Sequence, residues 1–327
     1  GPIMLDGDLS LRQRDSEALW DSFKQAGVEV SIGQGKERLP VILSGPWKEE
    51  QLKLGIDLDI SRSSQPLSSW MLASASLPMK VELKLQGKGV SNRHSKLTAE
   101  MIQLTGGKVE LNGSQCMLSP WIPSLQENYA VPGDASMTSF AFLATHCLDA
   151  EIELHGWPGA EQAIGHEILF DSAIECGIKW SGDILSCVGS KVPVTLDVTD
   201  SNDILPPLAA LLSLGGGGKI TGAAHAVHKE SNRLSRTVEV LSYFGIQATV
   251  LADGIEVAGN QKPIMPQEPV PTFDDHRLFM TAVLLASKTG GEVIGQTLHH
   301  VADEAFVQRL QDAGVGIETT TTPSLVD

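Results

Sequence analysis

Lysine, glutamate and arginine stand close together in the segment HAVHKESNRLSR (225–236), which combines the charges that acid–base chemistry and anion binding need. Lys229 and Arg233 are four residues apart, so a helix would place them on one face. Cations at a helix start oppose the helix dipole unless an anion binds there, so the pair indicates a phosphate or carboxylate ligand. Spacing alone favours a simpler interpretation, a surface helix with Glu230 in its first turn and solvated cations.

Two further segments place polar groups at expected helix starts. FDDHRLFM (273–280) has two acids, a histidine and an arginine ahead of an apolar stretch, and SRSSQP (61–66) supplies hydroxyl donors suited to a phosphate. Taken alone, His276 is best interpreted as a helix cap, and the serines as an ordinary N-cap cluster.

Patterns for metal and nucleotide binding are weak. The histidine pairs and the His-Glu pair lack a further ligand at metal-site spacing: His225 with His228, His299 with His300, and His166 with Glu167. The sequence contains no GxSxG, Walker A or GxGxxG motif, and the four glycines at 215–218 indicate a turn. We therefore expect neither a metal nor an organic cofactor.

A helical stretch that ends in glycine and leads directly into a strand-like stretch occurs five times. The glycines are Gly27, Gly107, Gly177, Gly245 and Gly314, at intervals of 80, 70, 68 and 69 residues. Glycine just after a helix adopts the left-handed conformation without a Cβ clash, which explains why each helix stops there. Repeats of about 70 residues indicate whole supersecondary units rather than solenoid turns.

From the second repeat onward, each repeat also has a more apolar helix that is rich in Ala and Leu and begins with polar residues. These polar starts are at 63–65, 133–136, 201–203 and 274–277. Such helices are expected to lie buried between sheets, capped by Ser, Asp or Asn. Aligned N-termini of buried parallel helices concentrate positive dipole ends, which attract phosphates and carboxylates.

Strand-like runs separate the helices. They are at 80–87, 151–157, 191–198 and 247–259. The last contains Asp253-Gly254, which predicts a hairpin turn. The sequence therefore predicts an α/β fold of two domains, built from mixed modules of two helices and about four strands.

Composition limits the partners. The chain has 327 residues and a formal charge of −16, with no run of Lys and Arg, which argues against nucleic-acid binding. It has no apolar run long enough for a membrane span and no signal-peptide pattern, so we expect a cytoplasmic protein. Gly1-Pro2 is typical of a protease scar, which predicts a natural start at Met4.

The four cysteines form no CxxC pair and have mostly apolar neighbours. They are Cys116, Cys147, Cys176 and Cys187. This pattern predicts buried free thiols in a reducing compartment.

Taken together, the motifs resemble the 5-enolpyruvylshikimate-3-phosphate synthase family, over essentially the whole chain. The matching segments follow the family's order: LDGDLSLRQR (5–14), SSQ (63–65), GVS (89–91), PGDAS (132–136), SND (201–203), HKESNR (228–233) and DDHR (274–277). The resemblance implies two domains of three βαβαββ units each, with the active site in the cleft. It also implies transfer of the enolpyruvyl group of phosphoenolpyruvate to the 5-hydroxyl of shikimate 3-phosphate, without metal or cofactor, in aromatic amino acid biosynthesis.

The resemblance implies a role for each matching residue of the first domain. Ser63, Ser64 and Ser91 would hold the phosphate of the ring substrate. Gln65 would lie between both ligands. The partners expected are therefore small anionic substrates that bridge the cleft, with domain closure as the expected motion.

The second domain would supply the chemistry. By the same resemblance, Asp203 would accept a hydrogen bond from the attacking hydroxyl, and Lys229 would bind hydroxyls near the reacting centre. Glu230 would act as general acid and base toward the enolpyruvyl methylene. The remaining residues would bind substrate, with the two arginines clamping phosphoenolpyruvate: Arg233, His276 and Arg277.

The chain departs from the family pattern in several places. Residues 1–131 would be the remnant of the first domain, about one and a half repeats, and 132–327 a complete second domain of three repeats. The family's N-terminal Lys-Ser, Arg and TAGT-type segments are missing. Ser10 stands where the family has arginine, His94 where it has tyrosine, and a position near His300 where it has lysine.

These departures leave three hypotheses. All but the tyrosine loss weaken the phosphoenolpyruvate half of the site. The first is an enolpyruvyl transferase, either a fragment of a longer chain or a short variant complemented by another polypeptide. The second is a repurposed homologue that acts on a phosphorylated ring without phosphoenolpyruvate, for example by eliminating phosphate. The third hypothesis is a non-catalytic binding protein that exposes apolar surface and forms an oligomer.

Overall fold

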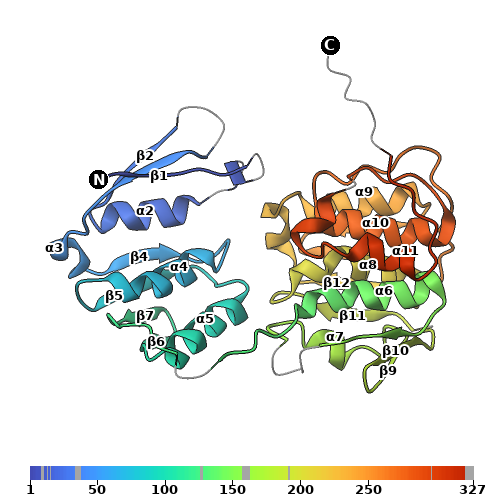
Figure 1. Ribbon diagram of the computed structural model, residues 1–327, viewed down its shortest axis with the longest axis horizontal. Helices are drawn as coiled ribbons and strands as arrows, with labels where there is room; N and C mark the ends of the chain where they lie inside the picture. The colour runs from blue at the N-terminus through green and yellow to red at the C-terminus, as the bar shows by residue number, and fades with distance from the viewer. Residues whose placement is uncertain are drawn as a thin grey trace, which may run out of the picture. The chain divides into compact units, whose positions relative to one another are not determined.

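The computed structural model describes residues 1–320 except 9–10, 13, 15, 34–37, 126–127, 157–162, 191 and 296. The chain divides into two compact units, residues 1–131 and the part from Pro132 onward (Figure 1). Each unit has its own hydrophobic core, and the two cores share none of the described residues. That the first unit is an incomplete domain and the second a complete one stays a prediction.

The first unit contains two sheets. The first sheet is antiparallel, with the order β1 (Ile3–Leu5), β3 (Val41–Ser44), β2 (Glu29–Ile32). The second has the order β4 (Ile56–Asp59), β5 (Val81–Gln86), β7 (Gln115–Leu118), β6 (Val109–Asn112). Its helices are α2 (Glu17–Gln25), α3 (Glu49–Leu52), α4 (Gln65–Ala73) and α5 (Asn92–Leu104). The core includes Trp70, which is fully buried and donates through Nε1 to Ser22 Oγ at 2.7 Å.

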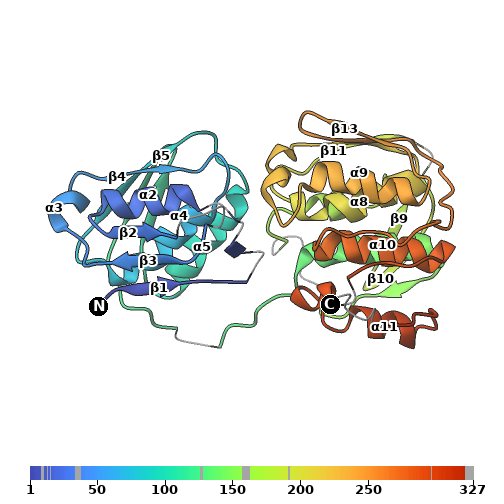
Figure 2. The same ribbon diagram turned by 90° about the horizontal axis from the view of Figure 1, so that it is seen from above.

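The second unit repeats this arrangement around a group of buried helices (Figures 1 and 2). Its sheets have the orders β8 (Ile152–Glu153), β10 (Ile184–Cys187), β9 (Ile178–Ser181), and β11 (Val194–Asp197), β12 (Gly218–Thr221), β14 (Gly254–Val257), β13 (Ala248–Leu251). Its helices are α6 (Thr138–Leu148), α7 (Ile168–Asp171), α8 (Leu205–Leu214), α9 (Arg233–Tyr243), α10 (His276–Thr289) and α11 (Phe306–Asp312). The apolar helices α6, α8 and α10 pack against one another, because they are apolar on nearly all sides.

The two four-stranded sheets share one construction. In each, two parallel strands are joined through a buried helix, and a hairpin follows the second helix: β4, α4, β5, α5, β6, β7 and then β11, α8, β12, α9, β13, β14. This is the βαβαββ unit that the resemblance implied. The three-stranded sheets share the order of their strands as well, which confirms the predicted α/β fold of repeated modules.

Several local predictions were wrong in detail. The left-handed residue after α5 is Gly106 (φ +90°) rather than Gly107. No strand follows Gly314 among residues 315–320. In the last hairpin Leu251 pairs with Gly254, so the turn is Ala252-Asp253 and the glycine belongs to the strand. There, a Cβ would collide with the carbonyl oxygen of Ile220.

The cysteine prediction holds for three of the four residues. Cys116, Cys147 and Cys176 are buried free thiols, and burial raises the pKa of each to about 12. Cys187 is a free thiol as well, but it is exposed; it is the last residue of β10.

Candidate active site

Four helix starts meet at one end of the buried helix group in the second unit. Ser136 lies just before α6, Asp203 lies in a short 3-10 turn (Asn202–Ile204) before α8, Arg233 is the first residue of α9, and Asp275 caps α10. Hydrogen bonds link these four residues to one another directly or through Arg277. The alignment of helix N-termini predicted from the sequence is therefore present, and it concentrates positive dipole ends at this cluster.

Arg233 is the centre of the cluster. Its guanidinium donates through Nε to Asp275 Oδ2 at 2.8 Å, through Nη1 to Asp203 Oδ1 at 2.6 Å and through Nη2 to Glu230 Oε2 at 2.5 Å. The side chain is only 1% exposed. Burial alone would lower the pKa of Arg233, but the three carboxylates raise it, so the residue stays charged.

Asp203 is the carboxylate that most cations approach. Besides Arg233, the Nζ atom of Lys229 lies 3.4 Å and the Nε atom of Arg277 lies 4.0 Å from Asp203 Oδ1. Burial alone would raise the pKa of Asp203, but Arg277, Lys229 and Arg233 lower it well below its ordinary value. Its side chain remains 28% exposed, so an ionised carboxylate is available at the surface of the cluster.

The start of α10 positions Arg277. Asp275 is fully buried, and its Oδ1 atom accepts the backbone N–H of Arg277 at 2.9 Å. The cap of α10 is therefore Asp275. The prediction from the sequence alone, that His276 is the cap, was wrong. The preceding residues Phe273 and Asp274 both have positive φ, at 55° and 56°, an unfavourable conformation for residues with a Cβ. The Cζ atom of Arg236 lies over the ring of Phe273, 4.1 Å from the centroid of that ring.

Arg277 joins this cluster to the start of α6. Its Nη1 atom donates to Ser136 Oγ at 3.0 Å, and Ser136 N in turn donates to Asp134 Oδ1 at 2.8 Å. His276 is the first residue of α10, and burial followed by the charges of Arg277 and Arg233 lowers its pKa. The structure therefore brings Arg277 and His276 to the same helix start.

Lys229 and Glu230 lie in the cluster, but they are not part of a helix as the sequence predicted. The segment before them is a 3-10 helix (Ala224–His228), Lys229 is extended, and α9 begins only at Arg233. The prediction that Lys229 and Arg233 share a helix face was therefore wrong. Both nevertheless contact Asp203 Oδ1, Lys229 at 3.4 Å and Arg233 at 2.6 Å. The surface-helix interpretation is also wrong, because Arg233 is buried.

The predicted serines of the first unit form a second group. Strands β4 and β5 are parallel, so the segments that follow them meet at one edge of the sheet. A Cβ at Gly87, just after β5, would lie 2.8 Å from Ser61 Cβ, just after β4. Ser63, Ser64 and Gln65 stand at the start of α4 and Ser91 at the start of α5, so the two adjacent helix starts carry all four predicted residues.

The hydroxyls of this serine group are placed differently from one another. Ser91 adopts a left-handed conformation (φ 51°), and neither Ser64 nor Ser91 caps its helix through its side chain. Ser63 Oγ accepts the backbone N–H of Gln65 at 3.1 Å. Two helix N-termini with nearby hydroxyls can bind a phosphate through N–H and O–H donors.

Of the three departures from the family pattern, the two that the structure describes take no part in the contacts of the ion cluster. Ser10 lies outside the described residues. His94 is in α5, where its Nδ1 atom is buried and has no hydrogen-bond partner among the residues that the structure describes. His300 lies in a 3-10 turn (Leu298–Val301), with its ring in edge contact with His299.

Asp275 and Ser136 hold the cluster together, yet sequence reasoning gave neither a role. The signal was present, because both residues lie within polar helix starts that were singled out, DDHR and PGDAS. Their partners could not be identified, because each pairs with a residue distant in sequence: Asp275 with Arg233, and Ser136 with Arg277.

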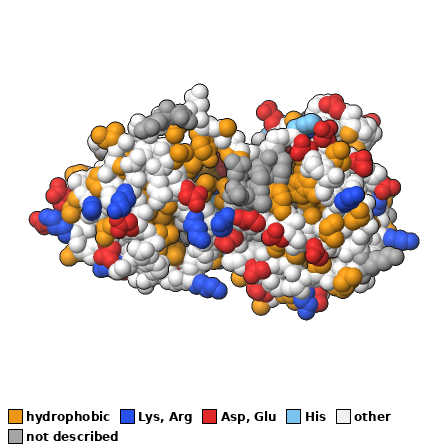
Figure 3. Space-filling model, turned by 90° about the horizontal axis from the view of Figure 1, so that it is seen from below, with side chains coloured by type: hydrophobic (Ala, Val, Ile, Leu, Met, Phe, Trp, Pro, Cys, Tyr) orange, Lys and Arg blue, Asp and Glu red, His pale blue; other side chains and the backbone are white. Residues whose placement is uncertain are grey.

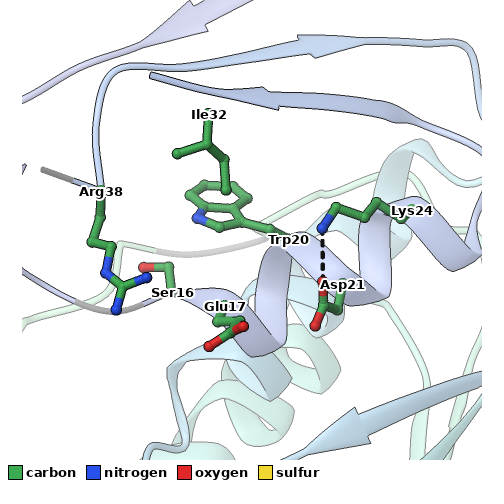
Figure 4. Close-up of a pocket in the computed structure, with 7 residues that line it drawn as sticks. All are labelled: Ser16, Glu17, Trp20, Asp21, Lys24, Ile32 and Arg38. Carbon is green, nitrogen blue, oxygen red and sulfur yellow. Dashed lines mark hydrogen bonds and ion pairs between the residues drawn. The ribbon is translucent and has the colours of Figure 1, made fainter. Parts of the chain in front are cut away.

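A pocket in the first unit lies apart from both groups. Figure 4 shows it between α2 and β2, with Trp20, Ile32 and Arg38 in its wall and Lys24 paired to Asp21 at 2.9 Å. It contains none of the predicted site residues. Within the described ranges, no group of three or more His, Cys, Asp or Glu side chains is arranged to hold a metal ion.

The surface and the helices limit the kinds of ligand. On the face drawn in Figure 3, Lys and Arg side chains lie singly or in small groups among Asp and Glu, so that face has no basic stripe for a nucleic acid. In the part of the chain that is described, no helix combines the length and the apolar character needed to cross a bilayer.

Comparison with known proteins identifies relatives that carry the name 3-phosphoshikimate 1-carboxyvinyltransferase. The chain is 29% identical over 303 residues to a 3-phosphoshikimate 1-carboxyvinyltransferase of Thermococcus kodakarensis, covering 91% of this chain and 71% of the relative. It is 27% identical over 312 residues to the protein of the same name from Methanosarcina mazei, covering 91% and 70%.

Solved structures give the same fold. An EPSP synthase from Acinetobacter baumannii matches with a TM-score of 0.71 at 22% identity, over 98% of this chain and 75% of that one. An enolpyruvyl transferase from Streptomyces tendae matches with a TM-score of 0.67 at 18% identity, over 99% and 75%. The family model described as EPSP synthase (3-phosphoshikimate 1-carboxyvinyltransferase) matches residues 1–310. With nearly all of its length matched by that model, the chain belongs to the EPSP synthase family.

Proposed function

We propose that this chain is an enolpyruvyl transferase that moves the enolpyruvyl group of phosphoenolpyruvate to the 5-hydroxyl of shikimate 3-phosphate. The observation that carries the proposal is the convergence of Asp203, Lys229, Glu230 and Arg277 around Arg233 at four helix starts. In a member of the EPSP synthase family, this group supplies the carboxylates and cations that the reaction requires.

The reaction divides between the carboxylates. Asp203, held ionised by its cations, accepts the hydrogen bond of the attacking hydroxyl and takes its proton as the hydroxyl oxygen bonds to C2 of phosphoenolpyruvate. That proton passes to the phosphate when the bond between C2 and the phosphate oxygen breaks. Glu230 gives a proton to the methylene carbon in this addition and removes one again when the phosphate leaves. Lys229 binds hydroxyls near the reacting centre. Each role places one charge at an atom where charge develops in the transition state.

The serine group of the first unit is the proposed site for the phosphate of the ring substrate. Ser63, Ser64 and Ser91 supply hydroxyls and two helix N-termini supply N–H donors. Gln65 extends the group toward the second ligand. We propose further that residues 1–131 form an incomplete first domain and the part from 132 onward a complete second domain.

A second candidate function follows from the pairing of Arg233. A phosphoenolpyruvate clamp needs guanidinium N–H groups directed at the ligand, but Arg233 donates to Asp275, Asp203 and Glu230 and is almost fully buried. The cluster holds three carboxylates and three cations, so it carries no net excess of positive charge. This favours a homologue that binds a phosphorylated ring and acts on it without phosphoenolpyruvate, with Asp203 or Glu230 as the base.

Phosphorus and proton NMR separates the two functions. The purified chain is incubated with shikimate 3-phosphate, with and without phosphoenolpyruvate. A new enolpyruvyl product that forms only with both substrates supports the transferase. Phosphate released from shikimate 3-phosphate alone supports the second candidate. No reaction in either sample, with no shift of protein resonances, contradicts both.

A matched pair of variants connects the activity to the cluster. Glu230→Gln removes the proposed acid and base while keeping the shape of the side chain, so turnover is expected to fall by about 10²–10⁴-fold. Glu239→Gln, in the nearby helix α9, loses only an exposed ion pair with Arg236 and is expected to keep full activity. Equal activity of the two variants would remove Glu230 from the mechanism.

A further inference from the structure

Three buried polar atoms beside the ion cluster have no hydrogen-bond partner among the described residues. They are His166 Nε2, Ser201 Oγ and Asn202 Oδ1. Their residues are 6%, 3% and 3% exposed. Buried polar groups are nearly always paired, because an unpaired one loses its hydrogen bonds to water without compensation. Three such atoms in adjacent segments indicate a place built for a polar ligand.

The backbone fixes the state of His166. Its Nδ1 atom lies 2.9 Å from the carbonyl oxygen of Ala163. A carbonyl oxygen can only accept, so Nδ1 carries the hydrogen and Nε2 presents a lone pair. Burial lowers the pKa of His166, which keeps the ring neutral. His166 therefore offers an acceptor and not a charge.

The loop that carries His166 lies against the start of α8. A Cβ at Gly165 would collide with the carbonyl oxygen of Asp200, three residues before Asp203, so the two backbones touch at this point. The charges of Asp203 and Arg277 both act on His166, which places its ring beside the ion cluster. The close backbone approach, which requires glycine at position 165, keeps His166 beside the ion cluster.

Asn202 completes the set from the other side. Its Nδ2 atom contacts Nε2 of His225, which leaves its Oδ1 atom as an acceptor without a partner. The neighbouring Ser201 hydroxyl can donate or accept. The three groups thus provide two acceptors and one hydroxyl, all without formal charge.

We propose that His166, Ser201 and Asn202 form a hydroxyl-binding subsite next to Asp203, which takes the ring hydroxyl adjacent to the attacking one. The inference rests on the proposed function, and it adds residues that orient the ring. Two acceptor lone pairs match the O–H groups of a polyol ring and repel the oxygens of a phosphate or carboxylate. The subsite therefore selects which part of an anionic ring substrate enters the second unit.

The test measures binding of the intact chain to two ligands by titration calorimetry: shikimate 3-phosphate, and its analogue with the 4-hydroxyl replaced by hydrogen. In the unchanged protein, the analogue is expected to bind about 10-fold more weakly, the effect of one lost hydrogen bond. In His166→Leu, shikimate 3-phosphate should itself bind about 10-fold more weakly, and the analogue should bind no worse than shikimate 3-phosphate.

Two further variants separate this role from a structural one. His166→Gln keeps an acceptor and should restore part of the preference for the hydroxyl. His146→Leu replaces another histidine with a buried unpartnered Nε2, in the last turn of α6, and should leave the tenfold preference unchanged. Circular dichroism establishes that each variant is folded.

The possible results are distinct. If His166→Leu weakens both ligands equally, the subsite is overturned although the proposed function stands. The same holds if the unchanged protein binds both ligands alike. If the unchanged protein does not bind shikimate 3-phosphate at all, the proposed function fails, and the subsite fails with it.

Discussion

At the scale of single residues, the ion cluster is organised by one buried arginine. Arginine presents five N–H donors in a fixed planar arrangement, so a single side chain can orient several carboxylates at once. Arg233 uses its Nε, Nη1 and Nη2 atoms on three different segments of the chain. This fixes Asp203 and Glu230 at positions that their own segments would not enforce.

Removal of Arg233 should therefore destabilise the second unit strongly. Arg233→Met leaves Asp275, which is fully buried, without its charge partner, and loss of one member of a buried pair costs about 3–5 kcal/mol. Arg236→Met on the same helix breaks an exposed pair with Glu239 and the contact with the Phe273 ring, which together are worth about 0.5–2 kcal/mol. Urea denaturation measures both free energies of unfolding, and equal losses would contradict the central role of Arg233.

Buried histidines should make the fold sensitive to mild acid. Burial lowers the pKa of His166, His225 and His276 below about 6.5. The unfolded chain then binds more protons than the folded chain between the lowered values and pH 6.5. The stability contribution of these neutral rings is thus complete above pH 6.5 and is lost as the pH falls toward the folded-state values.

Urea denaturation at pH 7 and pH 5 checks this dependence. The free energy of unfolding should fall by about 1.4 kcal/mol for each pH unit by which a folded-state pKa lies below 6.5. His276→Gln should reduce the dependence, and the same change at His155, whose side chain is 81% exposed, should not. A free energy that stays constant between the two pH values would show that the rings titrate freely.

Residue types could be predicted from the sequence more reliably than their partners. The motifs identified Asp203, Lys229, Glu230 and Arg233 as one group, and these residues do meet in space. The burial of Arg233 and the role of Asp275 could not be predicted, because both depend on a contact across 42 residues. Helical periodicity gave the wrong geometry for Lys229, because the extended backbone there is set by tertiary contacts.

At the scale of elements, the glycines that affect strand pairing most are those at which two backbones approach closely. The sequence predicted Asp253-Gly254 as a turn from the common type of hairpin. The register instead places Gly254 inside β14, against the carbonyl oxygen of Ile220. Turn position depends on the pairing of whole strands, which local sequence does not determine.

Gly254→Ala should therefore destabilise the sheet far more than a typical glycine replacement. The added Cβ would overlap the backbone of β12, so the two strands must separate, at an expected cost of more than about 2 kcal/mol. The control is Gly182→Ala in the β9–β10 turn, where the added Cβ meets open space and only the positive φ of 60° is unfavourable. That change should cost about 1 kcal/mol. Thermal unfolding compares the two, and a smaller loss for Gly254→Ala would contradict the register.

The repeated module was the part of the fold that sequence indicated best. Four of the five repeats give a strand after the helix and glycine, because that arrangement is encoded locally. The last repeat instead shows one isolated bridge, Val270 with Val293, among its described residues. Strand pairing there depends on neighbours elsewhere in the fold, so local periodicity does not determine it.

At the scale of the whole molecule, an acidic net charge is compatible with the proposed anion site. The field of the net charge and the field of the local cations and helix dipoles act over different distances. A net charge of −16 is spread over the surface and is screened within about 10 Å at ordinary salt concentrations. The helix starts and the cations Lys229 and Arg277 would act within a few ångström of an anion at the proposed site. Local geometry, rather than net charge, therefore decides whether an anion binds.

The second unit should fold without the first, because its core is composed entirely of its own residues. The full chain is expected to unfold in urea in two transitions, one for each unit. The fragment 132–327 is expected to unfold in one cooperative transition, whose midpoint equals that of one of the two. Arg233→Met should lower that midpoint in the fragment and in the full chain by the same amount, and leave the other transition in place. A fragment that unfolds without cooperativity, or a variant that shifts both transitions together, would show that the stability of the second unit depends on the first.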